Sequence, residues 1–496
     1  MTPDIFLGPP GTGKTETLLR EVERLLKKGL NPEEIGFVTF TRRAAREAVT
    51  RAAERFGMGE ERFRWFRTLH SLCFRVGDYS RGDVLAGRAL EEFADWAGVE
   101  FTPHRSETWL DGWNGPKTGD RIMHLENLAR VSGRPLQDVY DTTEHDLLWS
   151  EVRRVAGDLA AFKSARGMVD YTDMLANFCE GSPAHLGLRA LLVDEAQDLS
   201  VLQWRVVARL ADENPLESFI VAGDDDQAIY EWAGAAVEDF IRLPGRARVL
   251  SQSWRVPAAV QRVAAEVLSR VETRRSKEWS PRPEEGDVSR AVGFGEVDIG
   301  DGEDVLILAR NHIWLERDVA PVLRREGVYF SLSGEPSVSQ ETLDAVRAWE
   351  NLRRGEQIPT ELARLIQLWL PPGNRGRDIR RDESLVGAAD WGVGVAEPWH
   401  RALERMPSDE VSYILSMRSR GETLQGAPKV RLSTIHGSKG GQADHTVVLA
   451  DMSRRTAREA ERLPDQEARV WYVAVTRARQ KLTIVERSDS PYYFSL

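Results

Sequence analysis

A glycine-rich loop near the start of the chain limits what the chain can fold into. Residues 4–7 form a short apolar run, residues 8–15 read GPPGTGKT, and residues 15–28 have the apolar spacing of a helix that ends at Gly29. A second strand is predicted at residues 35–40. Strand, helix and strand in this order are typical of a parallel sheet with covering helices, so we predict an α/β fold.

The loop itself has the pattern that surrounds phosphate groups with backbone N–H groups. Lys14 is expected to reach the outer phosphates of a nucleoside triphosphate, and the Thr15 hydroxyl is expected to bind Mg²⁺. A chance match in a chain of this length has a probability on the order of one or two per cent, and the flanking strand and helix lower it. The predicted phosphate-binding residues are Gly8, Pro9, Pro10, Gly11, Thr12, Gly13, Lys14 and Thr15.

Residues 191–198, LLVDEAQD, are predicted to supply the second half of this site. A buried strand that ends in two carboxylates allows Asp194 to hold Mg²⁺, directly or through water, and allows Glu195 to orient and deprotonate the attacking water. A nucleoside kinase would also use a phosphate-binding loop. The adjacent glutamate and the length of 496 residues favour an ATPase over a kinase.

Residues 221–235, VAGDDDQAIYEWAGA, combine a polar group suited to sensing phosphate with aromatic rings suited to stacking on bases. If Gln227 faces a nucleotide and Trp232 faces a polymer, the segment couples the two. Taken alone, the pattern equally fits an acidic loop after a buried strand, with Tyr230 and Trp232 packed in the core. The surrounding motifs favour the coupling interpretation.

Two isolated arginines lie beside predicted strands of the second half of the chain, Arg255 in SQSWRVP and Arg477 in YVAVTRARQ. An arginine presented to a γ-phosphate stabilises the charge of the transition state, and an arginine supplied by a second α/β half does so only when the two halves close. Either residue could instead be an ordinary surface arginine.

The net charge of −11, from 67 basic and 78 acidic residues, argues against a protein that coats nucleic acid through its overall charge. Any nucleic-acid site must therefore be local. Residues 41–75 hold nine arginines against four glutamates, with aromatic residues between them. This mixture suits a groove that follows a phosphate backbone, and it equally suits a solvated arginine-rich helix.

Two cysteines, Cys73 and Cys179, cannot form a disulfide framework or a four-ligand zinc site, which favours a reducing cytosol. No run approaches 18 apolar residues, and no basic segment followed by an apolar stretch precedes the first motif. We therefore expect a cytoplasmic protein without a membrane partner.

Two stretches interrupt the α/β pattern. Residues 76–165 are helical, polar and tryptophan-bearing, and residues 354–425 are rich in Arg, Glu, Gly and Pro, so we interpret them as inserted segments. Further strand signals indicate a second α/β half; they lie at residues 249–252, 304–309, 328–332, 430–434, 446–450 and 482–485.

Eight motifs in order resemble the motif series of superfamily 1A helicases of the UvrD/Rep type: GPPGTGKT, FVTFTRRAAREAV, TLHSLCFR, LLVDEAQDLS, VAGDDDQAIYEWAGA, LSQSWRVP, LSTIHGSKGGQADHTVVLA and YVAVTRARQKL. The resemblance implies two RecA-like P-loop motor domains with parallel sheets, each interrupted by an insertion. ATP would bind with Mg²⁺ in the cleft between them. The implied boundaries are 1–75 and 166–247 for the first motor domain, 76–165 for its helical insertion, 248–353 and 426–496 for the second, and 354–425 for a reduced second insertion.

The resemblance also implies residue roles. Gln227 would read the γ-phosphate, Arg255 and Arg477 would be the arginines that act across the cleft, and Trp254 stands where such helicases usually carry a tyrosine that packs on adenine. An indole can stack there equally well. The positions that contact DNA in the family fall here on Phe40, Thr41, His70, Tyr230, Trp232, His436 and Lys439.

The sequence departs from the family pattern in three places. It begins seven residues before the phosphate-binding loop, so the upstream glutamine motif that recognises adenine is missing, and Gln442 after Gly441 replaces the usual Leu-Glu pair. The second insertion is short. We expect relaxed base selectivity, no transfer of the sugar contact to Gln442, and no family-type engagement of duplex by residues 354–425.

The expected function is an ATP-dependent 3′ to 5′ single-stranded DNA translocase and DNA helicase. Its partners would be single-stranded DNA and duplex with a single-stranded overhang, and it would act as a monomer. Three alternatives stay open: a translocase that strips proteins from DNA or loads a partner, a DNA-binding scaffold with nucleotide as a switch, and an enzyme that acts on RNA.

Overall fold

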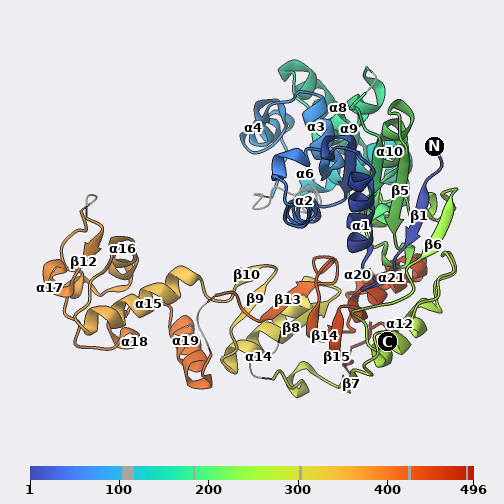
Figure 1. Cartoon of the computed structure of the whole chain (residues 1–496). Coiled ribbons are helices and arrows are strands. Elements are labelled where there is room, and N and C mark those ends of the chain that lie inside the picture. Colours follow the sequence, from blue (N-terminus) through green and yellow to red (C-terminus); the bar gives the residue numbers. More distant parts are fainter. Residues whose placement is uncertain (103–116, 183–184, 301–303, 381–382, 423–425, 488–489) are drawn as a thin grey trace. The chain divides into compact units, whose positions relative to one another are not determined.

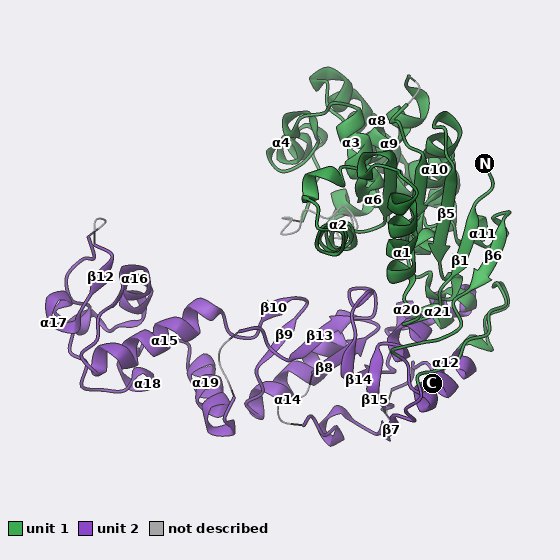
Figure 2. Ribbon diagram, viewed as in Figure 1, with its two compact units in different colours: residues 1–255, 268–282, 465–470 green, residues 256–267, 283–464, 471–496 purple. Residues whose placement is uncertain are grey.

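The computed structural model describes residues 1–102, 117–182, 185–300, 304–380, 383–422, 426–487 and 490–496, and these divide into two compact units (Figures 1 and 2). Unit 1 comprises Met1–Arg255, Leu268–Arg282 and Asp465–Val470. Unit 2 comprises Val256–Val267, Pro283–Pro464 and Trp471–Leu496. The chain therefore leaves unit 1 and returns to it twice.

Unit 1 is built on a six-stranded parallel sheet in the order β3-β2-β4-β5-β1-β6. Its strands are β1 (Asp4–Leu7), β2 (Ile35–Thr39), β3 (Phe66–Thr68), β4 (Ala190–Val193), β5 (Ser218–Gly223) and β6 (Arg246–Val249). All carboxyl ends of a parallel sheet lie at one edge, which is where ligands bind in α/β proteins. The prediction of an α/β fold with a parallel sheet is confirmed.

Helices cover both faces of this sheet because its strand residues alternate between two apolar clusters. Ala190 and Leu192 pack in one cluster, with α1 (Lys14–Lys27) and α2 (Arg42–Phe56). Leu191 and Val193 pack in the other, whose helices are α3 (Leu69–Val76), α9 (Tyr171–Glu180), α10 (Val201–Glu213) and α11 (Val237–Arg242). Serine and threonine caps begin several of them; Ser200 starts α10 in a capping box.

The first inserted segment has a hydrophobic core of its own, centred on Phe93 and Phe162. Its helices are α4 (Arg88–Ala97), α6 (Thr118–Ser132), α7 (Leu136–Thr142) and α8 (Trp149–Arg166). The described residues between 76 and 165 contribute no strand to the sheet of unit 1. This matches the predicted helical character.

Unit 2 contains a seven-stranded sheet in the order β10-β9-β13-β8-β14-β15-β7, parallel except for the β9–β10 pair. The strands are β7 (Asp287–Ala291), β8 (Val305–Ala309), β9 (Phe330–Leu332), β10 (Glu335–Pro336), β13 (Val430–Thr434), β14 (Ala443–Leu449) and β15 (Ala478–Val485). Its helices are α12 (Ala258–Leu268), α13 (His312–Trp314), α14 (Ala320–Arg325), α20 (Arg454–Arg462) and α21 (Pro464–Val475), of which residues 465–470 group with unit 1.

One strand prediction was wrong. The strand expected at residues 249–252, as the first of the second α/β half, is β6 at Arg246–Val249, and it pairs with β1 in unit 1. The other five strand signals coincide with β8, β9, β13, β14 and β15. The boundaries of motor domains and insertions drawn from the sequence stay a prediction.

The second inserted segment folds around three buried tryptophans, Trp349, Trp391 and Trp399. Its elements are α15 (Gln340–Arg353), β11 (Ile358–Pro359), α16 (Thr360–Trp369), β12 (Leu385–Val386), α17 (Ala388–Trp391), α18 (Trp399–Ala402) and α19 (Ser408–Arg420), most of which gather at one end of unit 2 in Figure 1.

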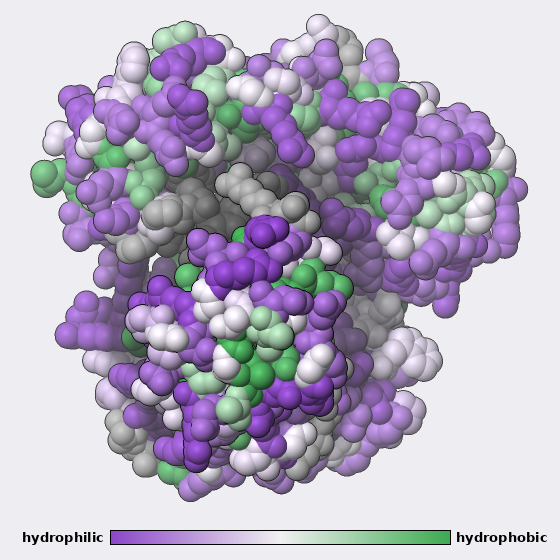
Figure 3. All heavy atoms as spheres, turned by 90° about the vertical axis from the view of Figure 1, so that its left-hand side faces the viewer, coloured by the Kyte–Doolittle hydropathy of each residue, from purple (hydrophilic) through white to green (hydrophobic). Residues whose placement is uncertain are grey.

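In the view of Figure 3 the surface is mostly hydrophilic with small hydrophobic patches. Among the residues that the structure describes, no helix is long and apolar enough to span a membrane.

Candidate nucleotide and nucleic-acid site

The phosphate-binding loop connects β1 to α1 in unit 1. Gly11 and Gly13 have φ values of 71° and 79°, a left-handed conformation that favours glycine. Gly8 gives room to Lys14, since a Cβ at Gly8 would lie 2.0 Å from Lys14 Cγ. Lys14 Nζ donates to Gly8 O at 3.1 Å, and its distance to Glu195 Oε2 is 3.7 Å. The loop thus places an ammonium group and the N-terminus of α1 together.

The acidic pair lies at the end of β4. Thr15 Oγ1 donates to Asp194 Oδ2 at 2.9 Å, and the backbone N–H of Glu195 donates to Asp194 Oδ1 at 2.9 Å. Glu195 has a φ of 54°, an uncommon conformation for a side-chain-bearing residue that is often found at functional sites. Burial, and next to it the charge of Glu195, raise the pKa of Asp194 to about 7.

This donor set fits Mg²⁺. The Thr15 hydroxyl and the Asp194 carboxylate offer hard oxygen ligands. A cation beside the buried Asp194 would favour its ionised form and so lower its raised pKa. No group of three or more His, Cys, Asp or Glu side chains that could hold a metal exists among the described residues. A magnesium ion here would therefore need phosphate and water oxygens, which is how this ion usually binds in nucleotide sites.

Gln227 is joined to Glu195 by an unbroken series of hydrogen bonds. Gln227 Nε2 donates to Asp224 Oδ2 at 2.6 Å, and the N–H of Asp224 donates to Gln197 Oε1 at 2.9 Å. Gln197 Nε2 in turn donates to Glu195 Oε2 at 2.7 Å and to Asp198 Oδ2 at 3.2 Å. The carboxylate and amide predicted from separate motifs thus belong to one network.

Gln197, which makes this connection, was not among the site residues predicted from the sequence. Gln197 is fully buried on the short turn after β4. A glutamine two positions after Glu195 is a weak signal in the sequence. Glutamine is equally common as an exposed surface residue, so its presence alone does not indicate a buried role in a site. Lys277, a buried lysine that contacts Asp224, was not predicted either. The only hint of it was the basic run RRSK at residues 274–277.

The SQSWR segment packs on the phosphate-binding loop within unit 1. Ser253 Oγ donates to Pro10 O at 2.7 Å, and the N–H of Trp254 donates to Gly11 O at 2.9 Å. The side chain of Trp254 is largely exposed, at 73%. Arg255 belongs to unit 1, whereas the sequence analysis placed it in the second α/β half, because β6 joins the first sheet and carries this segment to the loop.

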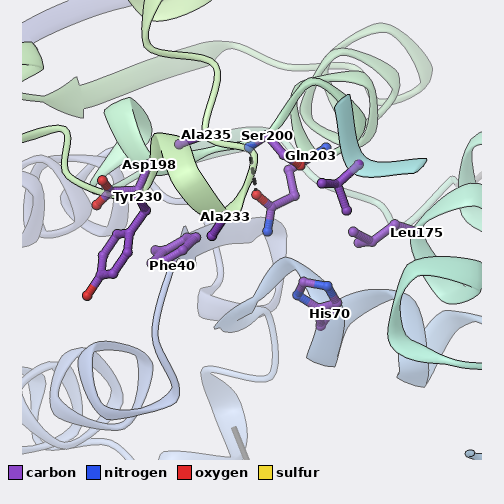
Figure 4. Close-up of a pocket in the computed structure, with 10 residues that line it drawn as sticks. Phe40, His70, Leu175, Asp198, Ser200, Gln203, Tyr230, Ala233 and Ala235 are labelled. Atoms are coloured by element: carbon purple, nitrogen blue, oxygen red, sulfur yellow. Dashed lines mark hydrogen bonds between the residues drawn. The ribbon is translucent and has the colours of Figure 1, made fainter. Parts of the chain in front are cut away.

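Phe40, His70 and Tyr230 come together around a small pocket in unit 1 (Figure 4). The ring centroids of Phe40 and Tyr230 are 5.3 Å apart, and those of Tyr230 and Trp232 are 6.4 Å apart. Burial, and to a smaller extent Arg42, lower the pKa of His70 to about 4, so its ring is neutral at pH 7. The structure therefore brings together three of the residues predicted to contact DNA.

Thr41 directly follows Phe40, which lines this pocket, and it also caps a helix. Its side chain accepts a hydrogen bond from the N–H of Ala44 and so caps α2. A change of Thr41 would therefore also affect the helix. Its predicted contact with DNA stays a prediction.

Unit 2 holds the remaining three candidate residues. Arg477 is buried, and its Nε and Nη1 donate to the carbonyl oxygens of Val473 and Gly441 at 2.9 and 3.3 Å. His436 and Lys439 lie on the turn after β13, where the N–H of Lys439 donates to His436 O at 3.2 Å. All other candidate residues lie in unit 1.

Family models match two stretches of the chain. Residues 2–233 match a model described as AAA domain, and residues 429–485 match a model described as UvrD-like helicase C-terminal domain. These stretches contain the phosphate-binding loop, the acidic strand end and Gln227 in the first, and His436, Lys439 and Arg477 in the second.

Curated proteins that the chain is similar to include ATP-dependent DNA helicase PcrA of two bacteria. The protein of Bacillus subtilis (strain 168) is 24% identical over 323 residues, which cover 61% of this chain and 42% of that protein. The protein of Staphylococcus epidermidis is 26% identical over 304 residues, which cover 55% of this chain and 39% of that protein. The chain thus matches about two fifths of the length of these relatives.

Among solved structures, the crystal structure of Arterivirus nonstructural protein 10 (helicase) aligns with 98% of this chain and 60% of that chain. The TM-score is 0.36 and the sequence identity is 12%, a similarity too low to support a functional argument.

Proposed function

Because the chain belongs to the UvrD-like superfamily 1 helicases, we propose that it is an ATP-dependent DNA helicase and a translocase that moves 3′ to 5′ along single-stranded DNA. The observation that carries the proposal is the hydrogen-bonded series from Thr15 and Asp194 through Glu195 and Gln197 to Gln227. This series connects a phosphate-binding loop, a hydrolytic carboxylate and a phosphate-sensing amide, which an ATP-driven motor needs together.

In the proposed reaction, the backbone of residues 8–13 surrounds the phosphates of ATP and Lys14 neutralises the outer ones. Thr15 and Asp194 would hold Mg²⁺, which supplies positive charge against the phosphate oxygens when it is bound. Glu195 orients the attacking water and accepts its proton. Gln227 senses the γ-phosphate and changes its contacts when that group leaves.

Three further residues complete the proposed nucleotide site. The exposed indole of Trp254 packs on the base of the nucleotide. The guanidinium groups of Arg255 and Arg477 stabilise the charge that develops on the transferred phosphoryl group. Both are arginines rather than lysines, which suits bidentate contact with phosphate.

We propose that the strand of DNA contacts Phe40, Thr41, His70, Tyr230 and Trp232 in unit 1, and His436 and Lys439 in unit 2. His70 is neutral and, like Phe40, largely buried, so the half-buried rings of Tyr230 and Trp232 would offer the stacking surface for bases. The proposed partners are single-stranded DNA and duplex DNA with a single-stranded overhang. The protein would act as a monomer.

The first test is Lys14→Ala in the full chain. Hydrolysis of ATP in the presence of single-stranded DNA should fall to background, a loss of at least about 100-fold, because the outer phosphates lose their cation. Lys27→Ala is the matched control: Lys27 ends the same helix, is exposed, and pairs with Glu23. Full hydrolysis by the Lys14→Ala variant would refute the proposed function.

A strand-displacement assay separates the proposed helicase from its alternatives. Duplexes with a 3′ overhang should be unwound and duplexes with a 5′ overhang should not. If single-stranded RNA stimulates ATP hydrolysis as strongly as single-stranded DNA does, the substrate would include RNA. Hydrolysis and strand movement without unwinding would leave a translocase that displaces proteins.

A further inference from the structure

The chain returns to unit 1 after α12, through residues 268–282, which we call the return segment. Three of its side chains or amides dock on Asp224–Asp226, the acidic turn that follows β5. Lys277 is at the centre: its Nζ lies 3.2 Å from Asp224 Oδ1, 2.5 Å from Asp225 Oδ1 and 3.0 Å from Asp226 Oδ2. The side chains of all four residues are at most 1% exposed.

Two arginines of the return segment complete the contact. The guanidinium of Arg274 donates to both carboxylate oxygens of Asp226, and the N–H of Arg275 donates to Asp225 Oδ2 at 2.7 Å. The guanidinium of Arg275 donates instead to carbonyl oxygens at the end of α11, at Phe240, Ile241 and Leu243. Asp226 and Asp225 therefore have partners besides Lys277.

Asp224 forms its ion pair with Lys277, whereas Asp226 is also paired with Arg274. Burial raises the pKa of Asp224, and Lys277 counteracts this rise. Burial lowers the pKa of Lys277, but the three carboxylates outweigh burial and raise its pKa above the ordinary value, so the ammonium is charged. A carboxylate buried without its cation is strongly disfavoured. Among the charges around Asp224, the ammonium group of Lys277 lowers its pKa most, and Lys14 lowers it to a smaller extent.

The two oxygens of Asp224 face different partners. Oδ1 lies against Lys277 Nζ, and Oδ2 accepts from Gln227 Nε2 at 2.6 Å. The carboxylate is therefore held from one side and holds the amide of Gln227 on the other. The backbone N–H of the same residue donates to Gln197, which contacts Glu195. One residue, Asp224, thus links the return segment to both groups proposed to act on ATP.

We propose that Lys277 is a positioning residue for ATP hydrolysis, which holds Asp224 so that Gln227 and, through Gln197, Glu195 keep the orientation that hydrolysis needs. The inference rests on the proposed function. The ion pairs of Lys277 are formed with the acidic turn rather than with the loop that would hold the phosphates, so nucleotide binding should depend little on it. The expected signature is a change of kcat without an equal change of nucleotide affinity.

The experiment compares Lys277→Met with the unmodified full chain. Single-stranded DNA-stimulated kcat should fall at least tenfold, while the Kd of a fluorescent ATP analogue, measured without DNA, should change less than threefold. Lys163→Met is the matched control, because the side chain of Lys163 is only 11% exposed and its Nζ lies 2.6 Å from carboxylate oxygens of Asp170 and Asp173, in the same unit. It should lower the thermal midpoint of unfolding with less than a twofold change of kcat.

The outcomes separate the inference from the proposed function. If the unmodified chain hydrolyses ATP and Lys277→Met retains its kcat, the positioning role is wrong and the proposed function stands. Equal losses of kcat in the Lys277→Met and Lys163→Met variants would reduce Lys277 to a stabilising residue and also overturn the inference. An unmodified chain without DNA-stimulated hydrolysis would overturn both.

A second variant covers the case in which Lys277→Met does not fold. Lys277→Met combined with Asp225→Asn removes one positive and one negative charge, so the net charge of the cluster is unchanged, while Asp224 still lacks its ammonium partner. This variant should fold and bind the ATP analogue, with kcat reduced at least fivefold. A normal kcat in the folded double variant would overturn the inference.

Discussion

Each of the two units contains a buried basic side chain that we propose serves ATP hydrolysis, and the two side chains are held in different ways. Lys277 of unit 1 lies among three carboxylates. Arg477 of unit 2 is oriented by hydrogen bonds to the backbone carbonyl oxygens of Val473 and Gly441. The compact ammonium group of Lys277 holds together the turn that carries the three carboxylates. The planar guanidinium group of Arg477 is oriented by backbone carbonyl oxygens, so its orientation depends on the backbone conformation.

The difference assigns different tasks to the two residues. Lys277 acts on protein groups and keeps the acidic turn in place. Arg477 directly precedes β15, so its direction is set by the junction between α21 and the sheet of unit 2. We expect a substitution of Arg477 to slow the reaction at the γ-phosphate itself. Substitutions in unit 1 should instead affect the orientation of the groups that act on ATP, or the coupling of hydrolysis to movement on DNA.

The largest effect is expected for Arg477→Lys. A lysine cannot reproduce the two carbonyl contacts together with a contact to phosphate, so kcat for ATP hydrolysis should fall about 100-fold while nucleotide affinity stays within a few fold. Steady-state hydrolysis and equilibrium binding measure the two quantities. Arg479→Lys is the control, because Arg479 lies two residues further along the chain, on β15, and pairs with Asp444 near the surface. Equal turnover in the Arg477→Lys variant would reject its role.

A smaller effect is expected for Trp232→Ala. Stacking of a base on an aromatic ring contributes roughly 1 to 3 kcal/mol, so single-stranded DNA should bind about 5- to 150-fold more weakly. At saturating DNA, hydrolysis should persist but fewer base pairs should be separated per ATP consumed. The exposed Trp96 of α4 provides the control substitution, Trp96→Ala. Unchanged unwinding per ATP would contradict the coupling role of Trp232.

The smallest effect concerns pH, and it compares one buried histidine from each unit. Burial lowers the pKa of both His70 and His445 to about 4. Between the unfolded value near 6.5 and this folded value, the unfolded chain binds more protons, so the free energy of unfolding decreases as the pH falls. For His70 the loss at pH 5.5 is about 1 kcal/mol.

Urea unfolding at pH 7 and pH 5.5 measures this loss. His70→Gln and His445→Gln should each make the free energy of unfolding less sensitive to acid than in the unmodified chain. If the units unfold in separate transitions, each substitution should act on the transition of its own unit. An unchanged acid sensitivity in His70→Gln would show that folding does not lower the pKa of this ring.

The sequence was sufficient where function depends on local order along the chain. The loop at residues 8–15, the acidic pair after β4 and the polar turn after β5 each follow a short apolar strand, and this pattern is visible without a structure. The predictions of strands and of an α/β fold depended on the same local signals.

The sequence was insufficient where a contact joins distant segments. Lys277 meets Asp225 across 52 residues, and no periodicity records such a contact. β6 was assigned to the wrong half because its sequence RARV is largely exposed at the edge of the sheet and carries little apolar signal. Arg255 was misplaced for the same reason, since its position follows from that of β6.

The division of the chain between the units limits where the protein can be truncated. The chain passes between them five times, after residues 255, 267, 282, 464 and 470 (Figure 2). A gene fragment that ends at residue 255 would encode the phosphate-binding loop and the acidic turn but not Lys277 or residues 465–470. Neither unit is therefore encoded by one continuous stretch of the chain, so a truncation at a single residue cannot isolate either of them whole.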